Sequence, residues 1–308
     1  MSKTFRIVTW GGIGDAIFLT PSLRALREQN PGARIRVYCW RRSHRDVLLH
    51  NPNVDALYSL WSWRSVRFGF VWALRRIKNN VFKLPRPFLD VAWGKARASI
   101  LYEIPAAEVI AQMIGIKIPG IKPEIYLTPR EEAAGRARLQ KFTKPVVAIH
   151  IRGASTRNKD WFLERWADLV ARHPEYTFVQ LGGPTEDTVP GAENFRGLEL
   201  RESFAVLKHC RAFVGIESGL SHVAAAYDIP GVVMFGASSS KVAGNPIHEH
   251  VQAGHSCAPC IDIIGAHDCP FKRACMKLIT VDAVSAALRR SLARHPAEVP
   301  AAGPAPAL

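Results

Sequence analysis

Short apolar runs alternate with amphipathic segments along most of the chain. The apolar runs that predict strands are residues 6–10, 34–40, 55–60, 145–151, 176–183, 212–216 and 231–236. The segments with helical spacing are residues 20–30, 162–173, 202–210 and 219–228. Strands that alternate with helices of about ten residues predict parallel sheets of the doubly wound α/β kind.

The alternation runs in two blocks, and the segment between them predicts a domain boundary. Thr128, Pro129 and Glu131 there have the pattern of a helix start with a capping box. We therefore predict two Rossmann-like domains that face a central cleft. The predicted parts are an N-terminal domain at 1–130, a linker at 131–144, a C-terminal domain at 145–294 with a Cys-rich loop at 255–276, and a disordered tail at 295–308.

Composition limits the class of protein. The chain has 308 residues, of which 48% are hydrophobic, enough for a large core. It contains no apolar run of about 18 residues and no N-terminal signal segment, so we expect a cytoplasmic protein. The 41 basic and 26 acidic residues give a net charge of +15, which favours an anionic partner. Nucleic acid, acidic lipid and a phosphorylated substrate are all anionic partners that a basic protein could bind.

A glycine-rich turn, "GGIGDA", follows the first predicted strand. It is not a dinucleotide fingerprint, because Ile17 stands where the third glycine is needed, and no P-loop lysine follows. Gly12 and Gly14 permit close backbone approach, and Asp15 then stands at the carboxyl end of the strand, where doubly wound sheets bind ligands. Asp15 could cap the next helix or act as a general base, and the two roles can coexist.

Two segments of the second half predict an anion site. Backbone N–H groups at the start of the helix after Glu217 and Ser218 suit a phosphate, and Ser221 and His222 add polar groups there. His222 could equally be a capping or surface histidine. After the strand at 145–151, the hydroxyls and cations of residues 155–159 suit a diphosphate, although an ordinary solvated loop is the alternative.

Several blocks resemble glycosyltransferase family 9, the heptosyltransferases of lipopolysaccharide core synthesis. Residues 11–38 resemble the family's N-terminal signature, and "STRNKDW", "GIESGLSHVAAAYDIPGVVMFG" and "CAPC…CM" resemble its C-terminal blocks in the right order. The similarity covers most of residues 5–290 and is weakest at 60–120. It implies a GT-B fold, with the acceptor on the N-terminal domain and ADP-heptose on the C-terminal domain, and inverting transfer without a catalytic metal.

The resemblance also implies roles for individual residues. The family's loop aspartate, taken as the base, matches Asp15. The donor-binding residues of the family match Ser155 or Thr156, Lys159, Glu217, Ser218, Gly219, Leu220 and His222. Where the family usually has aspartate, this chain has Glu217, which is one methylene longer and leaves room for a different donor sugar.

Four cysteines, Cys257, Cys260, Cys269 and Cys275, predict either a structural zinc or iron site or a family loop of reduced thiols. The first pair has metal-knuckle spacing, and four thiolates complete a tetrahedral site. His255 and His267 are alternative ligands. Cys39 and Cys210 read as buried residues without a metal role.

The basic, aromatic segment at 61–88 predicts an amphipathic helix. Such a helix could lie on an anionic membrane surface or grip a phosphorylated acceptor, or it could pack on its own sheet with a solvated basic face.

The sequence therefore predicts an inverting glycosyltransferase that moves heptose from ADP-heptose to an anionic, core-type acceptor at the inner membrane. A relative that uses another nucleotide sugar for a protein, capsule or small-metabolite acceptor is the alternative. A nucleic-acid-binding protein is a remote alternative that only the charge suggests.

Overall fold

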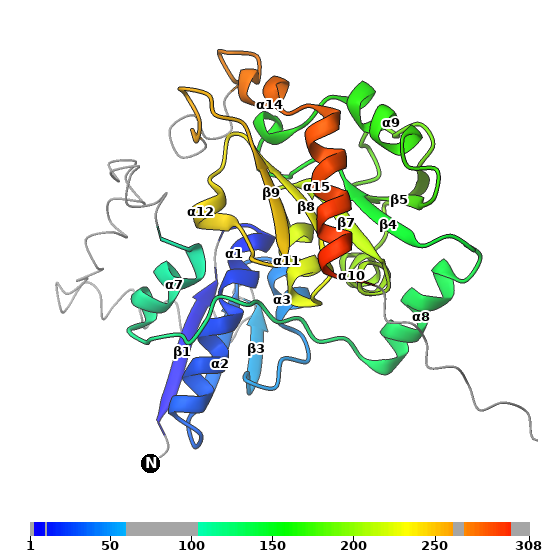
Figure 1. Ribbon diagram of the computed structural model, residues 1–308. Helices are drawn as coiled ribbons and strands as arrows, with labels where there is room; N and C mark the ends of the chain where they lie inside the picture. Colours follow the sequence, from blue (N-terminus) through cyan, green and yellow to red (C-terminus); the bar gives the residue numbers. More distant parts are fainter. Residues whose placement is uncertain (1–2, 10, 60–103, 261–267, 297–308) are drawn as a thin grey trace, which may run out of the picture.

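The computed structural model describes residues 3–9, 11–59, 104–260 and 268–296 (Figure 1). Its first part contains a three-stranded parallel sheet in the order β1-β2-β3. The described residues of this part form β1 Thr4–Thr9, α1 Ile13–Phe18, α2 Thr20–Gln29, β2 Arg34–Cys39, α3 Arg42–Leu48, β3 Ala56–Ser59 and α7 Ala106–Ile114. The three predicted strands of this part are confirmed, and α1 is an additional helix formed by the glycine turn itself.

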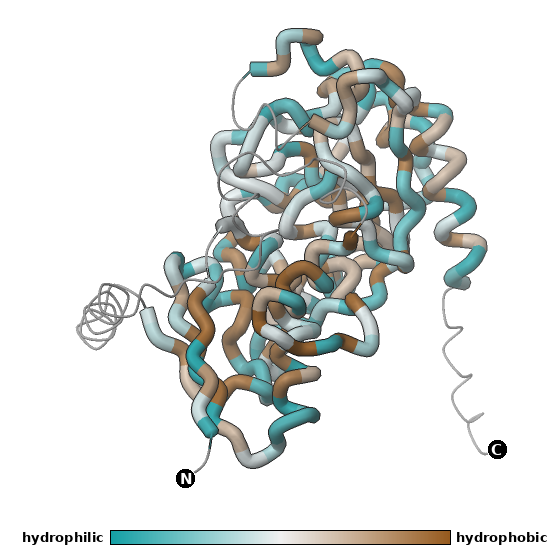
Figure 2. The backbone as a smooth tube through the Cα atoms, turned by 90° about the vertical axis from the view of Figure 1, so that its left-hand side faces the viewer, coloured by the Kyte–Doolittle hydropathy of each residue, from teal (hydrophilic) through white to brown (hydrophobic). Residues whose placement is uncertain are grey.

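The second part contains a six-stranded parallel sheet. Its strands are β4 Val146–His150, β5 Thr177–Gly182, β6 Glu193–Arg196, β7 Ala212–Ile216, β8 Gly231–Phe235 and β9 His248–Gln252. Its helices are α9 Leu163–Ala171, α10 Leu200–Lys208, α11 Gly219–Ala226, α12 Ser240–Ala243, α14 Ala274–Leu278 and α15 Val281–Arg294, with a 3₁₀ turn η1 at Arg157–Lys159. Every residue of β4, β7 and β8 is buried, as expected for strands covered by helices on both faces. Figure 2 shows hydrophobic stretches in both halves of the molecule.

The strand order of the second sheet creates a crevice at its centre. The order is β6-β5-β4-β7-β8-β9, so the chain moves outward from β4 to β6 and then returns to β7 beside β4. The helices that follow β4 and β7 therefore lead away on opposite sides. In open α/β sheets, ligands bind at the carboxyl ends of the strands at this switch point.

The predicted linker contains a helix that packs against the second half. This helix, α8 Pro129–Leu139, begins with the predicted capping box, in which Thr128 Oγ1 accepts from the Glu131 N–H. Gly135 brings α8 against α10 so closely that a Cβ atom there would lie 2.4 Å from Ala205 backbone atoms. The domain boundary itself remains a prediction from the sequence.

The two halves meet through glycines. A Cβ atom on Gly219 of α11 would lie 2.9 Å from Ile13 Cγ2 of α1, and one on Gly14 would lie 3.4 Å from His222 Cδ2. The Phe18 and His222 rings are 4.3 Å apart between centroids. The start of α1 is therefore held against the start of α11, which brings the glycine turn to the edge of the second sheet.

In the ranges that the structure describes, no helix combines the length and the hydropathy that a membrane crossing requires.

Candidate functional site

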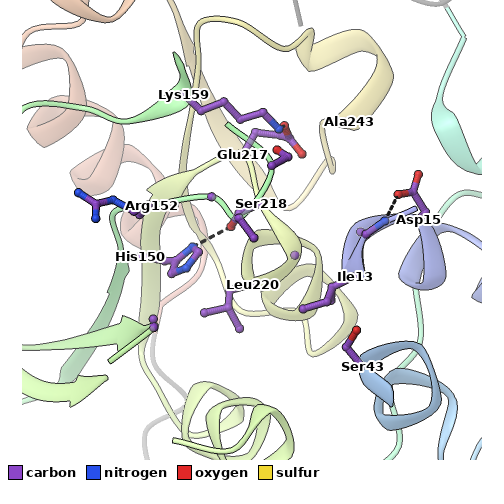
Figure 3. A pocket seen from close by; sticks show the side chains of 18 of the residues that line it. Ile13, Asp15, Ser43, His150, Arg152, Lys159, Glu217, Ser218, Leu220 and Ala243 are labelled. Carbon is purple, nitrogen blue, oxygen red and sulfur yellow. Dashed lines mark hydrogen bonds and ion pairs between the residues drawn. The ribbon is translucent and has the colours of Figure 1, made fainter. Parts of the chain in front are cut away.

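A cleft of about 820 Å³ lies between the glycine turn and the carboxyl ends of the second sheet (Figure 3). This volume is in the range of small-molecule sites. The predicted site residues that line it are Gly12, Gly14, Asp15, Ser155, Lys159, Glu217, Ser218, Gly219 and Leu220. Thr156 and His222, predicted to bind the donor, do not line it, nor do the four cysteines of the predicted metal site.

Asp15 is the third residue of α1, and its carboxylate is exposed to the cleft. The N-cap of α1 is Gly12, not Asp15, so the interpretation of Asp15 as an N-cap residue is wrong. Asp15 Oδ2 instead accepts from the Gly12 N–H at 2.7 Å, which closes the first turn of the helix. This bond fixes the position of the carboxylate against the first turn of the helix. An exposed carboxylate held in this way has the geometry of a base that can accept a proton from a bound hydroxyl.

His150 and Ser218 join the two strand ends at the switch point. His150 ends β4, and its Nδ1 lies 2.9 Å from the Ser218 Oγ, which follows β7 (Figure 3). Burial lowers the pKa of His150 to about 4, so the ring is neutral near pH 7. Ser218 is the N-cap residue of α11, but its hydroxyl makes no capping bond, because the Ser221 N–H donates to the Ser218 carbonyl oxygen instead. The Ser218 hydroxyl is therefore left to face the cleft at a helix N-terminus.

Lys159, Glu217 and His222 form a buried row of polar side chains next to Ser218. Lys159 Nζ forms an ion pair with Glu217 Oε2, and His222 Nε2 lies 3.4 Å from Glu217 Oε1 without hydrogen-bond geometry. Burial alone would raise the pKa of Glu217, but Lys159 and His222 outweigh it and hold that pKa well below its usual range. The amide nitrogen of Asn245 donates to His222 Nδ1 at 3.1 Å, which places the proton of a neutral ring on Nε2, toward Glu217. His222 thus acts on the cleft through Glu217.

The two hydroxyl residues of the loop after β4, Ser155 and Thr156, have different environments. Ser155 is exposed and lines the cleft. Thr156 is 7% exposed, and its hydroxyl accepts from the Asn158 N–H to cap η1, which positions Lys159. Of these two candidates, only Ser155 can offer a hydroxyl to a ligand in the cleft.

Sequence reasoning missed a carboxylate that lies in the loop after β5. Glu186 Oε1 accepts from the Gly183 N–H at 2.6 Å, while its Oε2 is buried without a hydrogen-bond partner and the side chain lines the cleft. Burial raises the pKa of this carboxyl. The sequence feature that could have indicated it is the pair Gly182 and Gly183 at the end of an apolar strand, because residues that follow such strand ends lie at the edge of the sheet where ligands bind. Arg152, Ser238 and Ser239, which also follow strands, line the cleft as well.

Arg41 and Ser43 bring groups from the first half to the cleft, at the start of α3. Arg41 takes part in none of the ion pairs made by the described residues. A cation without an acidic partner near Asp15 suits a negatively charged group on a ligand.

The four cysteines of the predicted metal loop are reduced, and two of them, Cys260 and Cys275, are buried. Over the ranges described, no three His, Cys, Asp or Glu side chains are grouped so that they could hold a metal ion. The loop nevertheless supports the cleft, since the Cys269 N–H donates to Asn158 Oδ1 and Arg273 to the Asp160 carbonyl. The metal stays a prediction from spacing. Cys39 and Cys210 are buried, as expected.

The basic segment at 61–88 and residues 297–308 of the tail lie outside the described residues, as does His267.

Comparison with solved structures shows what the whole chain is similar to. A glycosyltransferase family 9 protein from Veillonella parvula matches with 17% sequence identity over 95% of this chain and 97% of that chain, at a TM-score of 0.70. The E. coli ADP-heptose lipopolysaccharide heptosyltransferase II matches with 17% identity over 95% of this chain and 99% of that chain, at 0.67. The E. coli iron-containing dodecameric glycosyltransferase TibC matches with 18% identity over 95% of this chain and 77% of that chain, at 0.66. These similarities show the α/β GT-B fold.

Sequence comparison gives the family directly. No curated protein matches the chain. The model of glycosyltransferase family 9 (heptosyltransferase) matches residues 66–265, which is more than half of the chain and includes the loop at 155–159 and the segment at 217–222. The chain therefore belongs to glycosyltransferase family 9.

Proposed function

We propose that this protein is an inverting glycosyltransferase that moves a heptose from ADP-heptose to a hydroxyl of a lipopolysaccharide-core-type acceptor. One observation carries the proposal: the exposed Asp15 carboxylate lines the same cleft as Ser155, Lys159 and the N-terminus of α11. A proton acceptor thus faces a set of groups that suit a diphosphate. Structures similar in fold include TibC in complex with ADP-D-β-D-heptose and the ADP-heptose heptosyltransferase II of E. coli.

The reaction follows from the placement of these groups. Asp15 takes the proton of the acceptor hydroxyl, whose oxygen forms a bond to the anomeric carbon of the donor sugar. The bond between that carbon and the diphosphate oxygen breaks, and the electron pair leaves with ADP. Attack from the side opposite the leaving group inverts the anomeric configuration. The proposed transfer uses no metal ion.

Three kinds of group stabilise the negative charge that develops on the leaving diphosphate. Lys159 supplies a cation, Ser155 and Ser218 supply hydroxyls, and the start of α11 supplies backbone N–H groups. Glu186, a carboxylate whose side chain lines the cleft, suits the hydroxyl groups of a ribose or a sugar. These groups lie at the switch point, where the fold family of nucleotide-binding sheets places its ligands.

The acceptor that we propose is anionic and linked to lipid. The net charge of +15 supports an acceptor with phosphate or carboxylate groups. So does Arg41, which lines the same cleft as Asp15 and forms no ion pair with any acidic side chain that the structure describes. Such an acceptor would place the reaction at the cytoplasmic face of the inner membrane. Flotation with liposomes that contain or lack acidic lipid tests this contact, and equal recovery with both would contradict it.

A glycosyltransferase with another nucleotide sugar and a protein, capsule or small-metabolite acceptor is the second candidate. It is favoured by Glu217, which is longer than the aspartate usual in the family and reaches Lys159 directly. Thermal-shift measurements with ADP, UDP and GDP sugars separate the two candidates. A shift with ADP-heptose supports the first, and a shift only with another nucleotide sugar supports the second.

Replacement of the base tests the reaction itself. Asp15→Asn should keep the Gly12 N–H bond through its amide oxygen but lose the proton acceptor. General-base contributions are about 10²–10⁴-fold, so we expect a loss of that order in transfer rate with ADP affinity unchanged. Transfer at the wild-type rate would rule out Asp15 as the base.

A further inference from the structure

A buried histidine lies beneath the glycine turn and is not used by the proposed reaction. His44 of α3 is 0% exposed. Its Nδ1 lies 2.8 Å from Thr9 Oγ1, at the end of β1, and its Nε2 lies 3.3 Å from the Gly11 carbonyl oxygen. One ring thus joins the last residue of β1 to the first residue of the turn.

Chemistry assigns the direction of both bonds. A carbonyl oxygen can only accept, so His44 Nε2 must carry a proton and donate to Gly11. Burial lowers the pKa of His44, helped by the charge of Arg41, so the ring is neutral at pH 7 and its Nδ1 is an acceptor. The Thr9 hydroxyl therefore donates to Nδ1, a shorter contact than its alternative at 3.4 Å to the Tyr38 carbonyl.

The residue held by His44 is the one that supports the Asp15 carboxylate. Gly11 has a φ of +80°, and a Cβ atom there would lie 2.3 Å from Asp15 Oδ2. The next peptide N–H, of Gly12, donates to that same oxygen at 2.7 Å. The carboxylate therefore rests on the backbone of Gly11 and Gly12, so a change in the orientation of these peptides changes where Asp15 points.

We propose that His44 is a positioning residue for Asp15: through the Gly11 carbonyl it holds the glycine turn so that the carboxylate faces the acceptor hydroxyl in the cleft. The inference rests on the proposed function, in which Asp15 is the base. His44 itself touches neither substrate. Its effect belongs to the acceptor side of the cleft, because its partners lie on β1 and the turn and none lies on α11 or the loop at 155–159.

Three substitutions separate this role from a merely structural one. The amide nitrogen of glutamine reaches the place of Nε2, whereas that of asparagine reaches only the place of Nδ1. His44→Gln should therefore keep the bond to Gly11 and most of the transfer rate, while His44→Asn and His44→Phe should lose it. Because a misplacement of about 1 Å can cost roughly 10²-fold, we expect kcat to fall about 10- to 100-fold in the latter two variants, with the Kd of ADP unchanged.

His173 offers a matched control. It is also buried, and its ring bonds to Ser285 and Glu175, away from the cleft. His173→Asn should lower the thermal stability without lowering kcat. If the His44→Gln and His44→Asn variants have equal melting temperatures and equal kcat values, the positioning role is refuted. If His44→Phe does not fold, Thr9→Val gives a second test, because it removes the hydroxyl that binds Nδ1, together with the acceptor of the Trp40 N–H. A lower kcat with an unchanged Kd of ADP in this variant would support the positioning role, and a wild-type kcat would contradict it.

A double variant distinguishes failure of this inference from failure of the proposed function. If His44 acts through Asp15, then His44→Asn should lower kcat strongly in the wild-type background and by less than about twofold in the Asp15→Asn background, since groups that act as a unit are non-additive. Full additivity would overturn the inference while leaving the function intact. A wild-type rate for Asp15→Asn alone would instead overturn the function.

Discussion

Lys159 and Glu217 form a buried ion pair across the switch point, although they lie 58 positions apart in the sequence. Both side chains are about 10% exposed, and both line the cleft in which we place the donor diphosphate. A bound diphosphate would therefore share Lys159 with an internal carboxylate. The pair holds the lysine in place before the donor arrives, at the cost of competition for its charge.

Substitution of Lys159 and substitution of Glu217 should have different effects on stability and on ADP binding. Lys159→Met leaves a buried carboxylate without its cation, so we expect a loss of about 3–5 kcal/mol in the free energy of unfolding. Glu217→Gln frees the lysine, so we expect a smaller loss and tighter ADP binding. Urea unfolding and calorimetric titration with ADP measure both effects. Weaker ADP binding by Glu217→Gln would show that the carboxylate does not compete.

The exposed pair of Lys141 and Glu193 is a control for that comparison. Its side chains are 62% and 49% exposed, so Lys141→Met should change stability by less than about 1 kcal/mol.

Ser218 and His150 should act together in donor binding. Ser218→Ala removes the hydroxyl that is hydrogen-bonded to His150 and that we expect to bind the diphosphate. A hydrogen bond to a charged phosphate contributes about 1.5 kcal/mol, so the Kd of ADP should rise roughly tenfold. His150→Phe should give a similar loss, and the double variant should be little worse than either single one. Independent, additive losses would show that His150 does not orient the hydroxyl.

Acid should weaken the contact between α8 and α10 through Glu131. Arg201 binds this carboxylate with two nitrogens, and this bond lowers the pKa of Glu131 from 4.5 to about 2 despite partial burial. A depressed pKa adds stability above the unfolded value, and this stability is lost as the pH falls from about 4.5 toward 2. The wild type should therefore be more stable than Glu131→Gln at pH 7, with the difference shrinking over that interval. A difference that is constant from pH 7 to 2 would contradict the assignment.

Close contact between the halves predicts that Gly219 tolerates no side chain. Gly219→Ala would place a carbon 2.9 Å from Ile13 Cγ2, so α11 or α1 must move and both ADP affinity and transfer should fall. Gly120→Ala should leave both unchanged, because an added Cβ atom there would lie within 4 Å of no described residue other than its chain neighbours. Ile13→Ala should partly restore the Gly219→Ala variant. No restoration would place the cause elsewhere in the helix.

Metal analysis decides the question posed by the cysteine spacing. If Cys257, Cys260, Cys269 and Cys275 hold zinc or iron, purified protein should contain about one ion per chain and lose it on Cys260→Ser. Chelation should then lower the melting temperature, because the loop is tied to Asn158 next to Lys159. Cys39→Ser serves as the control, since this thiol is buried in the first half. Metal-free protein with the same melting temperature would identify the cysteines as ordinary thiols.

Much of the fold could be predicted from the sequence, because β4, β7 and β8 are buried on both faces and therefore appear as continuous apolar runs. The edge strands β6 and β9 were missed for the opposite reason: "ENFR" and "HEHVQ" are mostly polar, and pairing with a neighbour is what makes them strands. In the cleft, Asp15 and the segment at 217–220 could be predicted as candidates because glycines precede or follow them at strand ends.

Other features depend on contacts between residues that are distant in the sequence. That Thr156 caps η1 while Ser155 faces the cleft depends on how the loop turns, and both hydroxyls look equivalent in the sequence. His44 has no motif at all. Its role arises only when α3 packs beneath the turn between β1 and α1.

The meeting of Gly14 and Gly219 also bears on how such a protein can diversify. Where two walls of a site meet through side chains, each substitution at the contact alters the spacing between them. Here the spacing is determined largely by backbone and by Ile13, so the loops after β4, β5 and β8 can change their side chains without changing the distance from the proton acceptor to the leaving group. Substitutions in these loops can then change the preference for donor or acceptor independently, while the distance between the proton acceptor and the leaving group stays the same.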